Sequence, residues 1–333
     1  MFKKLNVPTN EEEVTRTWKY IERVYVSVVC TTYNQDIYIR DAIDSFLAQE
    51  TEFKFEIIIH DDLSKDSTRE LLFEYQRKYP SIIKLILPEI NQYSININMP
   101  FKNSLAVCEG EYVAICEGDD FWVDKYKLQK QFEVLRDNPD FNLCAHPAFI
   151  LKSDGECIAT DIHSNNISSI PTKNVVSSGG AFLQTNSLFI RASSIKNLPE
   201  WFYQTAPIGD YYVQVIASYP NGIMYIPDIM SIYRNESEGS FTKNILSDRF
   251  KLVYLNKSIV QHNHLCEQLL DNKSLVESFF NFNKCLIFSS VKLSGSYLNM
   301  IKVIFLFRSE TFKFKFLISI FYSVKNKFLR KLK

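Results

Sequence analysis

The sequence predicts an α/β fold with a mainly parallel central sheet. Short apolar, β-rich runs alternate with amphipathic segments along residues 24–136, and the 46% hydrophobic content of the 333 residues is typical of a globular protein. Strands that alternate with helices at this spacing are joined by right-handed crossovers and therefore lie parallel. Ligands bind such sheets at the edge formed by the carboxyl ends of the strands.

Residues 1–23 are predicted to be a lead-in segment with a short helix that begins after Thr9 or Asn10. Glu11 to Glu13 favour this position because acidic side chains stabilise the amino end of a helix. The segment lacks the apolar core of about 7 to 15 residues that a signal peptide needs. No stretch of about 18 apolar residues occurs in the chain, so we expect no membrane-spanning helix.

The first β-loop-α unit begins with Val24 to Cys30, which we predict to be a buried strand. Thr31 to Gln35 follows as a loop, and a helix comes next. The helix has one apolar face at helical spacing, formed by Ile39, Ala42, Ile43, Phe46 and Leu47. We expect this face to pack against the sheet.

The second unit repeats the pattern. Phe55 to His60 is predicted as a strand, and Asp61-Asp62 lies at its carboxyl end. Ser67 and Glu70 have capping-box spacing, which predicts a helix from there to Tyr79. The pattern then predicts a third strand and a short helix, over Ile82 to Leu87 and Pro100 to Cys108.

The fourth predicted strand, Tyr112 to Cys116, leads into the acidic stretch Glu117-Gly118-Asp119-Asp120, before a helix predicted over Val123 to Arg136. This stretch and Asp61-Asp62 should share one edge of the sheet. Carboxylates there are hard oxygen ligands suited to Mg²⁺ or Mn²⁺ that bridge to phosphate oxygens. A solvated acidic turn in which Asp120 caps the next helix is the alternative.

The first strand is not followed by Gly-x-Gly-x-x-Gly, and no Walker loop occurs, which argues against dehydrogenase-type and P-loop sites. Instead, several blocks in order resemble family 2 of the inverting glycosyltransferases, of the bacterial polysaccharide or cell-surface glycan type. These blocks are residues 26–34, 59–68, 110–113 and 117–120. The resemblance implies a GT-A nucleotide-sugar-binding fold over residues 24–240, with a nucleotide-binding half, 24–136, and an acceptor half, 137–240.

In that family the first loop and the acid pair after the second strand hold the base and ribose of a nucleotide sugar. The resemblance implies donor-binding roles for Thr31, Tyr33, Asn34, Asp61, Asp62, Glu117, Gly118, Asp119 and Arg234. Whether Asp61 or Asp62 contacts uracil or ribose stays open, and Asn34 and Asp62 can also be ordinary turn formers.

The family's metal motif is Asp-x-Asp, and Glu117 stands at its first position here. The resemblance implies that Asp119 is the direct ligand of Mg²⁺ or Mn²⁺, with Asp120 an outer partner or a helix cap. Glu117 can reach the ribose or a water molecule on the metal.

In the acceptor half, the resemblance implies that Asp210 is the catalytic base and that Arg234 binds diphosphate. The residues alone allow simpler roles, a helix N-cap for Asp210 and a surface ion pair for Arg234. Gly179-Gly180 suggests close backbone approach or positive φ. His146 is more simply explained as a satisfied polar residue than as a catalyst.

Residues 241–333 are predicted to be a helical C-terminal region with a basic amphipathic tail. From Val291 onward the chain contains ten Lys or Arg residues and a single acidic residue, Glu310. An apolar stripe accompanies them, formed by Leu317, Ile320, Phe321, Val324 and Phe328. This pattern favours binding to an anionic membrane surface. The alternative is a terminal helix packed on the body of the protein.

The sequence thus predicts a metal-dependent inverting glycosyltransferase that uses a nucleotide-diphosphate sugar and a glycan or lipid-linked acceptor. The seven cysteines show no Cys-x-x-Cys spacing, which favours reduced thiols in the cytoplasm, and the tail would place the protein on the inner face of the membrane. Nucleic acid is not an expected partner. The alternatives are a nucleotidyltransferase acting on sugar phosphates, although Thr31 to Asp36 lacks a Gly-rich basic loop, and a non-catalytic sugar-binding or scaffold protein.

Overall fold

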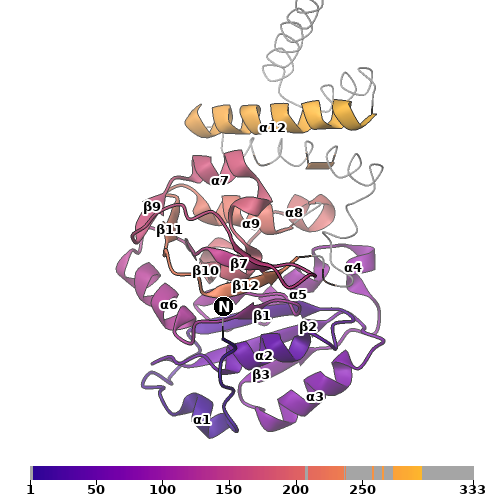
Figure 1. Cartoon of the computed structure of the whole chain (residues 1–333), viewed down its shortest axis with the longest axis vertical. Coiled ribbons are helices and arrows are strands. Elements are labelled where there is room, and N and C mark those ends of the chain that lie inside the picture. The colour runs from indigo at the N-terminus through magenta and orange to yellow at the C-terminus, as the bar shows by residue number, and fades with distance from the viewer. Residues whose placement is uncertain are drawn as a thin grey trace, which may run out of the picture.

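The computed structural model describes residues 3–206, 209–235, 237, 257–258, 265 and 273–294. A central sheet runs through the molecule (Figure 1). Its strands, in spatial order, are β3 (Ile83–Ile86), β2 (Phe55–Asp61), β1 (Val26–Thr32), β4 (Tyr112–Ile115), β10 (Phe189–Arg191), β6 (Leu143–Ala145), β11 (Ile223–Tyr225) and β9 (Ser168–Ile170). A smaller sheet contains β5 (Phe121–Trp122), β12 (Ser231–Arg234), β7 (Ala148–Leu151) and β8 (Cys157–Ala159).

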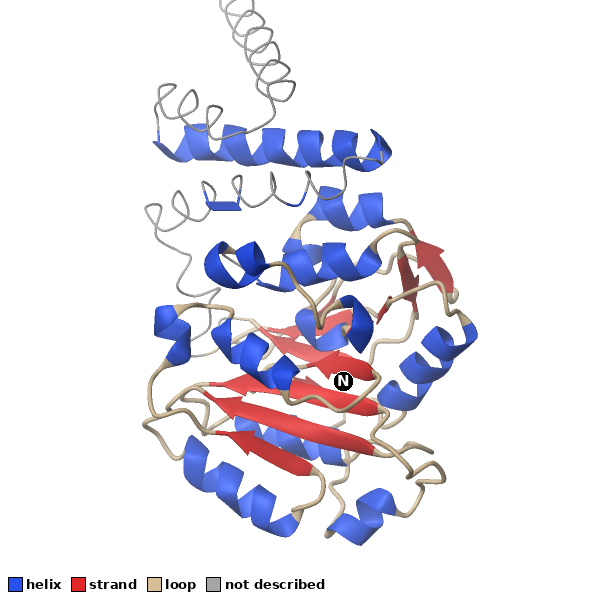
Figure 2. Ribbon diagram, turned by 180° about the vertical axis from the view of Figure 1, so that it is seen from behind, coloured by secondary structure: helices blue, strands red, loops and turns tan. Residues whose placement is uncertain are grey.

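Helices cover both faces of the central sheet, as Figure 2 shows from behind. The described helices are α1 (Glu11–Thr15), α2 (Ile39–Leu47), α3 (Thr68–Lys78), α4 (Gln92–Ile95), α5 (Met99–Ala106), α6 (Lys127–Asp137), α7 (Thr172–Ser178), α8 (Glu200–Thr205), α9 (Gly209–Ser218) and α12 (Lys273–Ser294). Short 3₁₀ turns are η1 (Gly180–Phe182), η2 (Thr185–Ser187) and η3 (Ala192–Ser194).

The predicted parallel sheet is confirmed for β3, β2, β1 and β4, which pair with one another in parallel. In the register, Thr32 lies opposite Asp61, so the loops after β1 and β2 leave the sheet side by side. Beyond β4 the sheet is mixed, because β10 pairs antiparallel with both β4 and β6.

Strand alternation divides the core into two apolar clusters. Val28 of β1 faces the cluster that includes α2, α3 and α6, and its neighbour Val29 faces the cluster that includes α5 and α7 to α9. The predicted apolar face of α2 is confirmed, since Ile39, Ala42, Ile43, Phe46 and Leu47 are all completely buried. The predicted start of α1 is confirmed as well, because the Asn10 side chain accepts the Glu13 N–H at 2.9 Å.

Two local predictions are wrong. The Ser67 side chain does not cap α3; instead Asp66 accepts the Thr68 N–H at 3.0 Å. The helix predicted from Val123 begins only at Lys127, because Phe121 and Trp122 form β5 and pair with β12. Asp120 is therefore too far from the helix to cap it.

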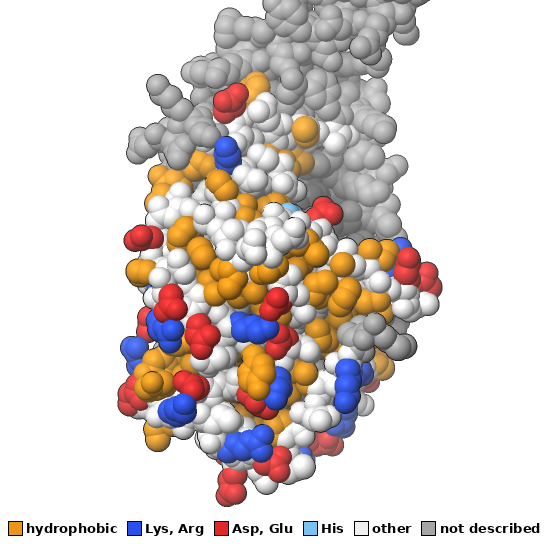
Figure 3. Space-filling view, turned by 60° about the vertical axis from the view of Figure 1, so that its left-hand side comes forward, with side chains coloured by type: hydrophobic (Ala, Val, Ile, Leu, Met, Phe, Trp, Pro, Cys, Tyr) orange, Lys and Arg blue, Asp and Glu red, His pale blue; other side chains and the backbone are white. Residues whose placement is uncertain are grey.

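On the face shown in Figure 3, side chains of both charges are interspersed over the lower part of the molecule. Exposed ion pairs among the described residues include Arg23–Glu111 at 3.0 Å and Lys125–Glu50 at 2.9 Å. Such pairs contribute about 0–1 kcal/mol each, so the stability of the fold rests mainly on its apolar core.

The helix α12 lies across α7 and contributes to the core (Figure 1). Its Leu275 and Phe279 belong to the same apolar cluster as α7, α8 and α9. The rest of the predicted C-terminal region, including the tail from residue 295, lies outside the described residues. Within the described parts of the chain, no helix is long and apolar enough to cross a bilayer.

Phe279→Ala should destabilise the folded protein, because Phe279 is completely buried between α12 and the body. Removal of a buried phenyl ring costs about 3–5 kcal/mol. Urea unfolding measures the change, and Glu277→Ala on the exposed face of the same helix is the matched control. Equal unfolding midpoints for the two variants would contradict the packing of α12.

Candidate active site

The two acidic loops are tied to the end of β1 by backbone hydrogen bonds. Asp62 N donates to the Thr32 carbonyl at 2.9 Å, and Gly118 N donates to the Thr31 carbonyl at 3.0 Å. The prediction that both acid clusters share one edge of the sheet is therefore confirmed.

Gly118 is required by close packing at this edge. A Cβ atom there would lie 2.5 Å from Oε1 of Gln35 and 2.8 Å from Oγ1 of Thr32. Thr32 in turn donates its hydroxyl to Gln35 at 2.8 Å. Any larger side chain at position 118 would push the acidic loop away from the first loop.

Asp120 holds the acidic loop in place through buried hydrogen bonds. It is completely buried, with Oδ2 accepting from Nδ2 of Asn186 at 3.0 Å and Oδ1 accepting from the Arg234 N–H at 2.8 Å. Burial, then the charges of Asp119 and Glu117, raise its pKa well above the ordinary value. Asp120 is thus a structural partner of Asp119, and the helix-cap alternative is wrong.

Asp119 lies at the front of the loop and is 8% exposed. The Ser237 hydroxyl donates to its Oδ2, and its carbonyl accepts from Nη1 of Arg234 at 2.5 Å. Residues far along the chain therefore fix both the side chain and the backbone of this acid.

Glu117 interacts by charge with both Asp119 and Asp210, so these three carboxylates form one group. Burial, followed by the charges of Asp119 and Asp210, raises the pKa of Glu117 to about 8. Burial raises the pKa of Asp210 to about 6. A carboxyl group with a raised pKa near the operating pH is suited to take a proton.

Asp210 does not act as the N-cap of α9. It lies inside the helix, which begins at Gly209, and its Oδ1 accepts the N–H of the adjacent Tyr211 at 2.6 Å. Its Oδ2 accepts from Oγ1 of Thr185 at 3.4 Å. The polar turn Thr185-Asn186-Ser187 thus serves both the base candidate and Asp120.

The acid cluster could hold a divalent cation only together with substrate phosphates and water molecules. Within the described residues, no group of three His, Cys, Asp or Glu side chains is arranged to hold a metal ion. Mg²⁺ commonly binds through one or two carboxylates, with substrate phosphates and waters as the other ligands. The crowded charges of Glu117, Asp119 and Asp120, which raise pKa values, are the environment that such a cation would relieve.

The structure separates the roles of the two acids after β2. Asp61 is completely buried, and its Oδ2 pairs with Nε of Arg69 at 2.5 Å. Asp62 accepts the N–H groups of Gln92 at 2.7 Å and Tyr93 at 2.9 Å. Asp61 therefore holds Arg69, whereas Asp62 holds the start of α4.

The first loop combines exposed and structural residues. Tyr33 is 42% exposed, and Thr31 is partly exposed beside it. Asn34 has a φ of 52°, and its Oδ1 accepts the Lys65 N–H at 2.8 Å. Asn34 therefore acts here as a turn former that joins the first loop to the loop after β2.

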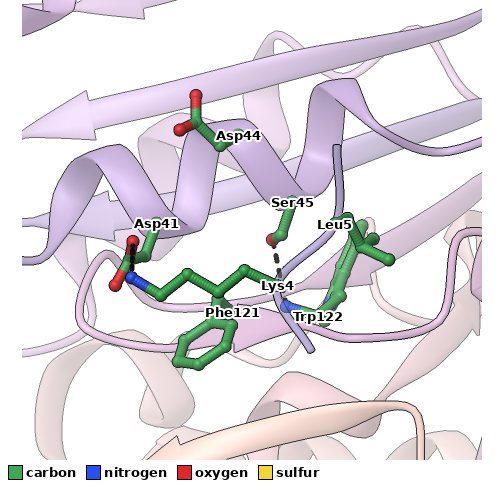
Figure 4. A pocket seen from close by; sticks show the side chains of 7 residues that line it. All are labelled: Lys4, Leu5, Asp41, Asp44, Ser45, Phe121 and Trp122. Carbon is green, nitrogen blue, oxygen red and sulfur yellow. Dashed lines mark hydrogen bonds and ion pairs between the residues drawn. The ribbon is translucent and has the colours of Figure 1, made fainter. Parts of the chain in front are cut away.

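Arg234 makes the ion pair that was the alternative to diphosphate binding. Its guanidinium pairs with Asp41 and lies 4.5 Å from the ring centroid of Phe121. Asp41 also binds Lys4 at 2.6 Å, as Figure 4 shows. In this structure Arg234 holds the acidic loop against α2, and diphosphate contact stays a proposal.

The cavity drawn in Figure 4 is separate from the donor site. It lies between the N-terminal segment, α2 and β5, and its volume is about 40 Å³. Ligand sites for molecules of drug size take about 300–1,000 Å³. This cavity is therefore too small for a nucleotide sugar, and the candidate donor site is the edge formed by the two acidic loops.

Sequence reasoning missed the partners that hold these acids. Asn186 bonds Asp120, Ser237 bonds Asp119, and Asp41 bonds Arg234. His146 is buried, and burial lowers its pKa well below the ordinary value, which agrees with a structural role. Gly179 has a φ of 74°, and a Cβ there would lie 2.9 Å from Cζ of Phe282, so both suggested reasons for glycine apply.

An α/β sheet with acid loops after the two parallel strands that flank β1 is the arrangement of a GT-A fold. The chain belongs to glycosyl transferase family 2, whose family model matches residues 27–197.

One relative is similar to this chain in sequence, and two solved structures are similar to it in fold. An uncharacterized protein of Mycobacterium tuberculosis is 37% identical over 223 residues, which are 64% of this chain and 60% of that protein. S. aureus TarS 1–349 in complex with UDP has a similar fold, with a TM-score of 0.59 at 16% identity over 84% of this chain and 78% of that chain. A mannosyltransferase from Pyrobaculum calidifontis in complex with GDP-Man and Mn²⁺ gives 0.55 at 14% identity, over 97% and 84%.

Proposed function

We propose that this protein is a metal-dependent inverting glycosyltransferase that moves a sugar from a nucleoside diphosphate to an acceptor hydroxyl. The observation that supports the proposal is a group of interacting carboxylates, since the charges of Asp119 and the partly buried Asp210 both act on Glu117 where the acidic loops meet. Two solved structures of similar fold contain UDP or GDP-Man, which supports a nucleotide donor for this site.

The proposed reaction is a single displacement. Asp210 accepts the proton of the acceptor hydroxyl, the hydroxyl oxygen forms a bond to the anomeric carbon, and the bond from that carbon to the diphosphate breaks. The nucleoside diphosphate leaves with the electron pair. Attack on the face opposite the leaving group inverts the configuration at the anomeric carbon.

The residues have distinct tasks in this reaction. Thr185 orients the Asp210 carboxylate through its hydroxyl, and Asp119, with Glu117 beside it, would hold Mg²⁺ or Mn²⁺. A bound divalent cation would stabilise the charge of the departing diphosphate. Asp120, Asn186 and Ser237 keep the acidic loop in place.

A panel of nucleotide sugars tests the proposal. The purified protein, incubated with Mn²⁺ and each donor, should release a nucleoside diphosphate from at least one of them. Release of pyrophosphate instead would indicate a nucleotidyltransferase. Binding of donors without any product would indicate a non-catalytic sugar-binding protein.

The nucleotide pocket can be tested at the acid pair. Asp62→Asn should weaken binding of UDP about tenfold or more, because a hydrogen bond to a charged group contributes about 1.5–3 kcal/mol. Asp61→Asn should mainly lower stability, since it leaves Arg69 without its buried partner. Calorimetry and thermal unfolding separate the two effects. If both variants bind UDP as the parent does, the acid pair is not part of the nucleotide pocket.

We further propose that the tail from about Ser294 to Lys333 holds the enzyme on the cytoplasmic membrane face, where it would act on a lipid-linked acceptor in surface polysaccharide or glycan assembly. The ten basic residues from Val291 onward contribute about 1 kcal/mol each near an anionic surface. The full chain should float with anionic liposomes at low salt and dissociate at high salt. A chain ending near residue 290 is the comparison. If neither floats, the tail does not bind membranes.

A further inference from the structure

The linker between α4 and α5 reaches from the nucleotide-binding half to the acceptor half. Asn98 is 4% exposed, and its Nδ2 donates to the carbonyls of Phe202 and Ala206, both at 2.9 Å. Asn96 Nδ2 donates to the Tyr203 carbonyl in the same way. These bonds join chain segments that are more than a hundred residues apart.

The oxygen of the same amide abuts the start of α9. A Cβ atom on Gly209 would lie 2.6 Å from Oδ1 of Asn98, so the two residues are in close contact. Gly209 directly precedes Asp210 and is the first residue of α9. One buried side chain therefore contacts the segment before the base candidate and the residue next to it.

The other end of the linker is attached to β2. The Asn98 N–H donates to Oδ1 of Asn96 at 2.9 Å, and the Asn96 N–H donates to the Gln92 carbonyl at 2.9 Å. Gln92 is held in turn by Asp62, through its N–H at 2.7 Å, and by Nε2 of His60, through its side chain at 2.9 Å. A continuous set of hydrogen bonds thus runs from the nucleotide side to Phe202 and Ala206, and a close contact of Asn98 with Gly209 reaches the start of α9.

We propose that Asn98 is a positioning residue that fixes the Asp210 carboxylate relative to a donor held in the nucleotide-binding half. The proposal rests on the function proposed above. The two halves must present the base and the anomeric carbon in one geometry, and a misplacement of about 1 Å can cost about 100-fold in rate. Asn98 is suited to this task because it belongs to the nucleotide-binding half by its backbone, while its buried amide contacts the acceptor half.

Asn98→Leu tests the proposal, because leucine keeps the volume but cannot donate to the two carbonyls. In the full-length protein, turnover of the donor selected by the panel should fall about 10- to 100-fold. Release of nucleoside diphosphate by hydrolysis, with water in place of the acceptor hydroxyl, is a sufficient assay. The KM for that donor and the Kd for UDP with Mn²⁺ should stay within about twofold of the parent values.

A matched control is Asn138→Leu, which removes an amide bond to the Val134 carbonyl at the end of α6, far from Asp210 in the chain. It should leave turnover unchanged. If Asn98→Leu does not fold, Asn98→Asp gives the same reading, since a carboxylate cannot donate to the carbonyls. Parent-like turnover in the folded variant, or a parallel loss of UDP binding, overturns the proposal. Parent-like turnover of Asp210→Asn would instead overturn the proposed function.

Discussion

Asp210→Asn is expected to lower kcat by about 100-fold or more while nucleotide binding stays close to that of the parent. The amide keeps the size of the side chain, and its oxygen can still accept from the Tyr211 N–H while its NH2 group can donate to the Thr185 hydroxyl oxygen, but it cannot take the acceptor proton. General-base catalysis typically contributes about 10²- to 10⁴-fold. Turnover with saturating donor and UDP calorimetry measure the two quantities.

The pH dependence supplies an internal check on this assignment. Burial raises the pKa of Asp210 to about 6, so the ionised, active form prevails above that pH. Activity should therefore fall on its acid side through pH 6, by about tenfold for each further unit. Because the folded pKa exceeds the unfolded one, ionisation of Asp210 costs stability as pH rises through this range. Asp210→Asn should accordingly unfold at a higher temperature than the parent at pH 8.

Thr185→Val is the matched control for the same site. The Thr185 hydroxyl is 3.4 Å from Asp210 Oδ2, so its loss removes one long hydrogen bond and leaves the carboxylate in place. A decrease in kcat of less than about tenfold is expected, since a single neutral bond contributes about 0.5–1.5 kcal/mol. If Asp210→Asn loses no more turnover than Thr185→Val, Asp210 is not the base.

Local patterns in the sequence predicted an element correctly where the structure of that element depends only on its own residues. The apolar face of α2 depends only on residues at helical spacing, and every one of them is buried. The two-residue strand β5 has no such signal. Phe121 and Trp122 become a strand because Ser231 and Ile232, far along the chain, pair with them. The helix predicted from Val123 begins late for that reason.

In the candidate site, too, some features could be predicted from local sequence and others depend on residues far along the chain. Acids at strand ends could be located because the topology of a parallel sheet brings those ends together. The side chains that hold the acids come from other elements. Asn186 precedes β10, Asp41 lies on α2, and Ser237 follows β12. No spacing along the chain relates these residues to Asp119 or Asp120, so only the folded structure could identify them.

The role inferred for Arg234 differs between the sequence and the structure, because the structure shows which residues it contacts. In the sequence it is a cation near a presumed diphosphate. In the structure its guanidinium pairs with Asp41 and bonds the Asp119 carbonyl, and its N–H bonds Asp120. These contacts give Arg234 a structural role in shaping the acidic loop, whether or not it also contacts a donor. The position of Asp119 therefore depends on residues from both sheets.

Asp119→Asn is expected to remove most turnover, by about 100-fold or more, without unfolding the protein. An amide can still accept from the Ser237 hydroxyl, so the loop should keep its shape. The variant loses the negative charge that would hold a divalent cation against the diphosphate, and metal stabilisation of a leaving group contributes several kcal/mol, or about tenfold for each 1.36 kcal/mol. EDTA should lower parent activity similarly, and Mn²⁺ should restore it.

A more specific test of the metal role measures whether metal and nucleotide stabilise the protein cooperatively. In the parent, Mn²⁺ and UDP together should raise the unfolding temperature more than either does alone, because each would complete the other's site. Asp119→Asn should lose that extra stabilisation. Asp124→Asn, at an acid paired with Lys130 outside the cluster, should keep it. Full turnover in EDTA, or an unchanged coupling in Asp119→Asn, would mean that this transferase works without a metal at Asp119, with Glu117 and Asp119 serving the nucleotide directly.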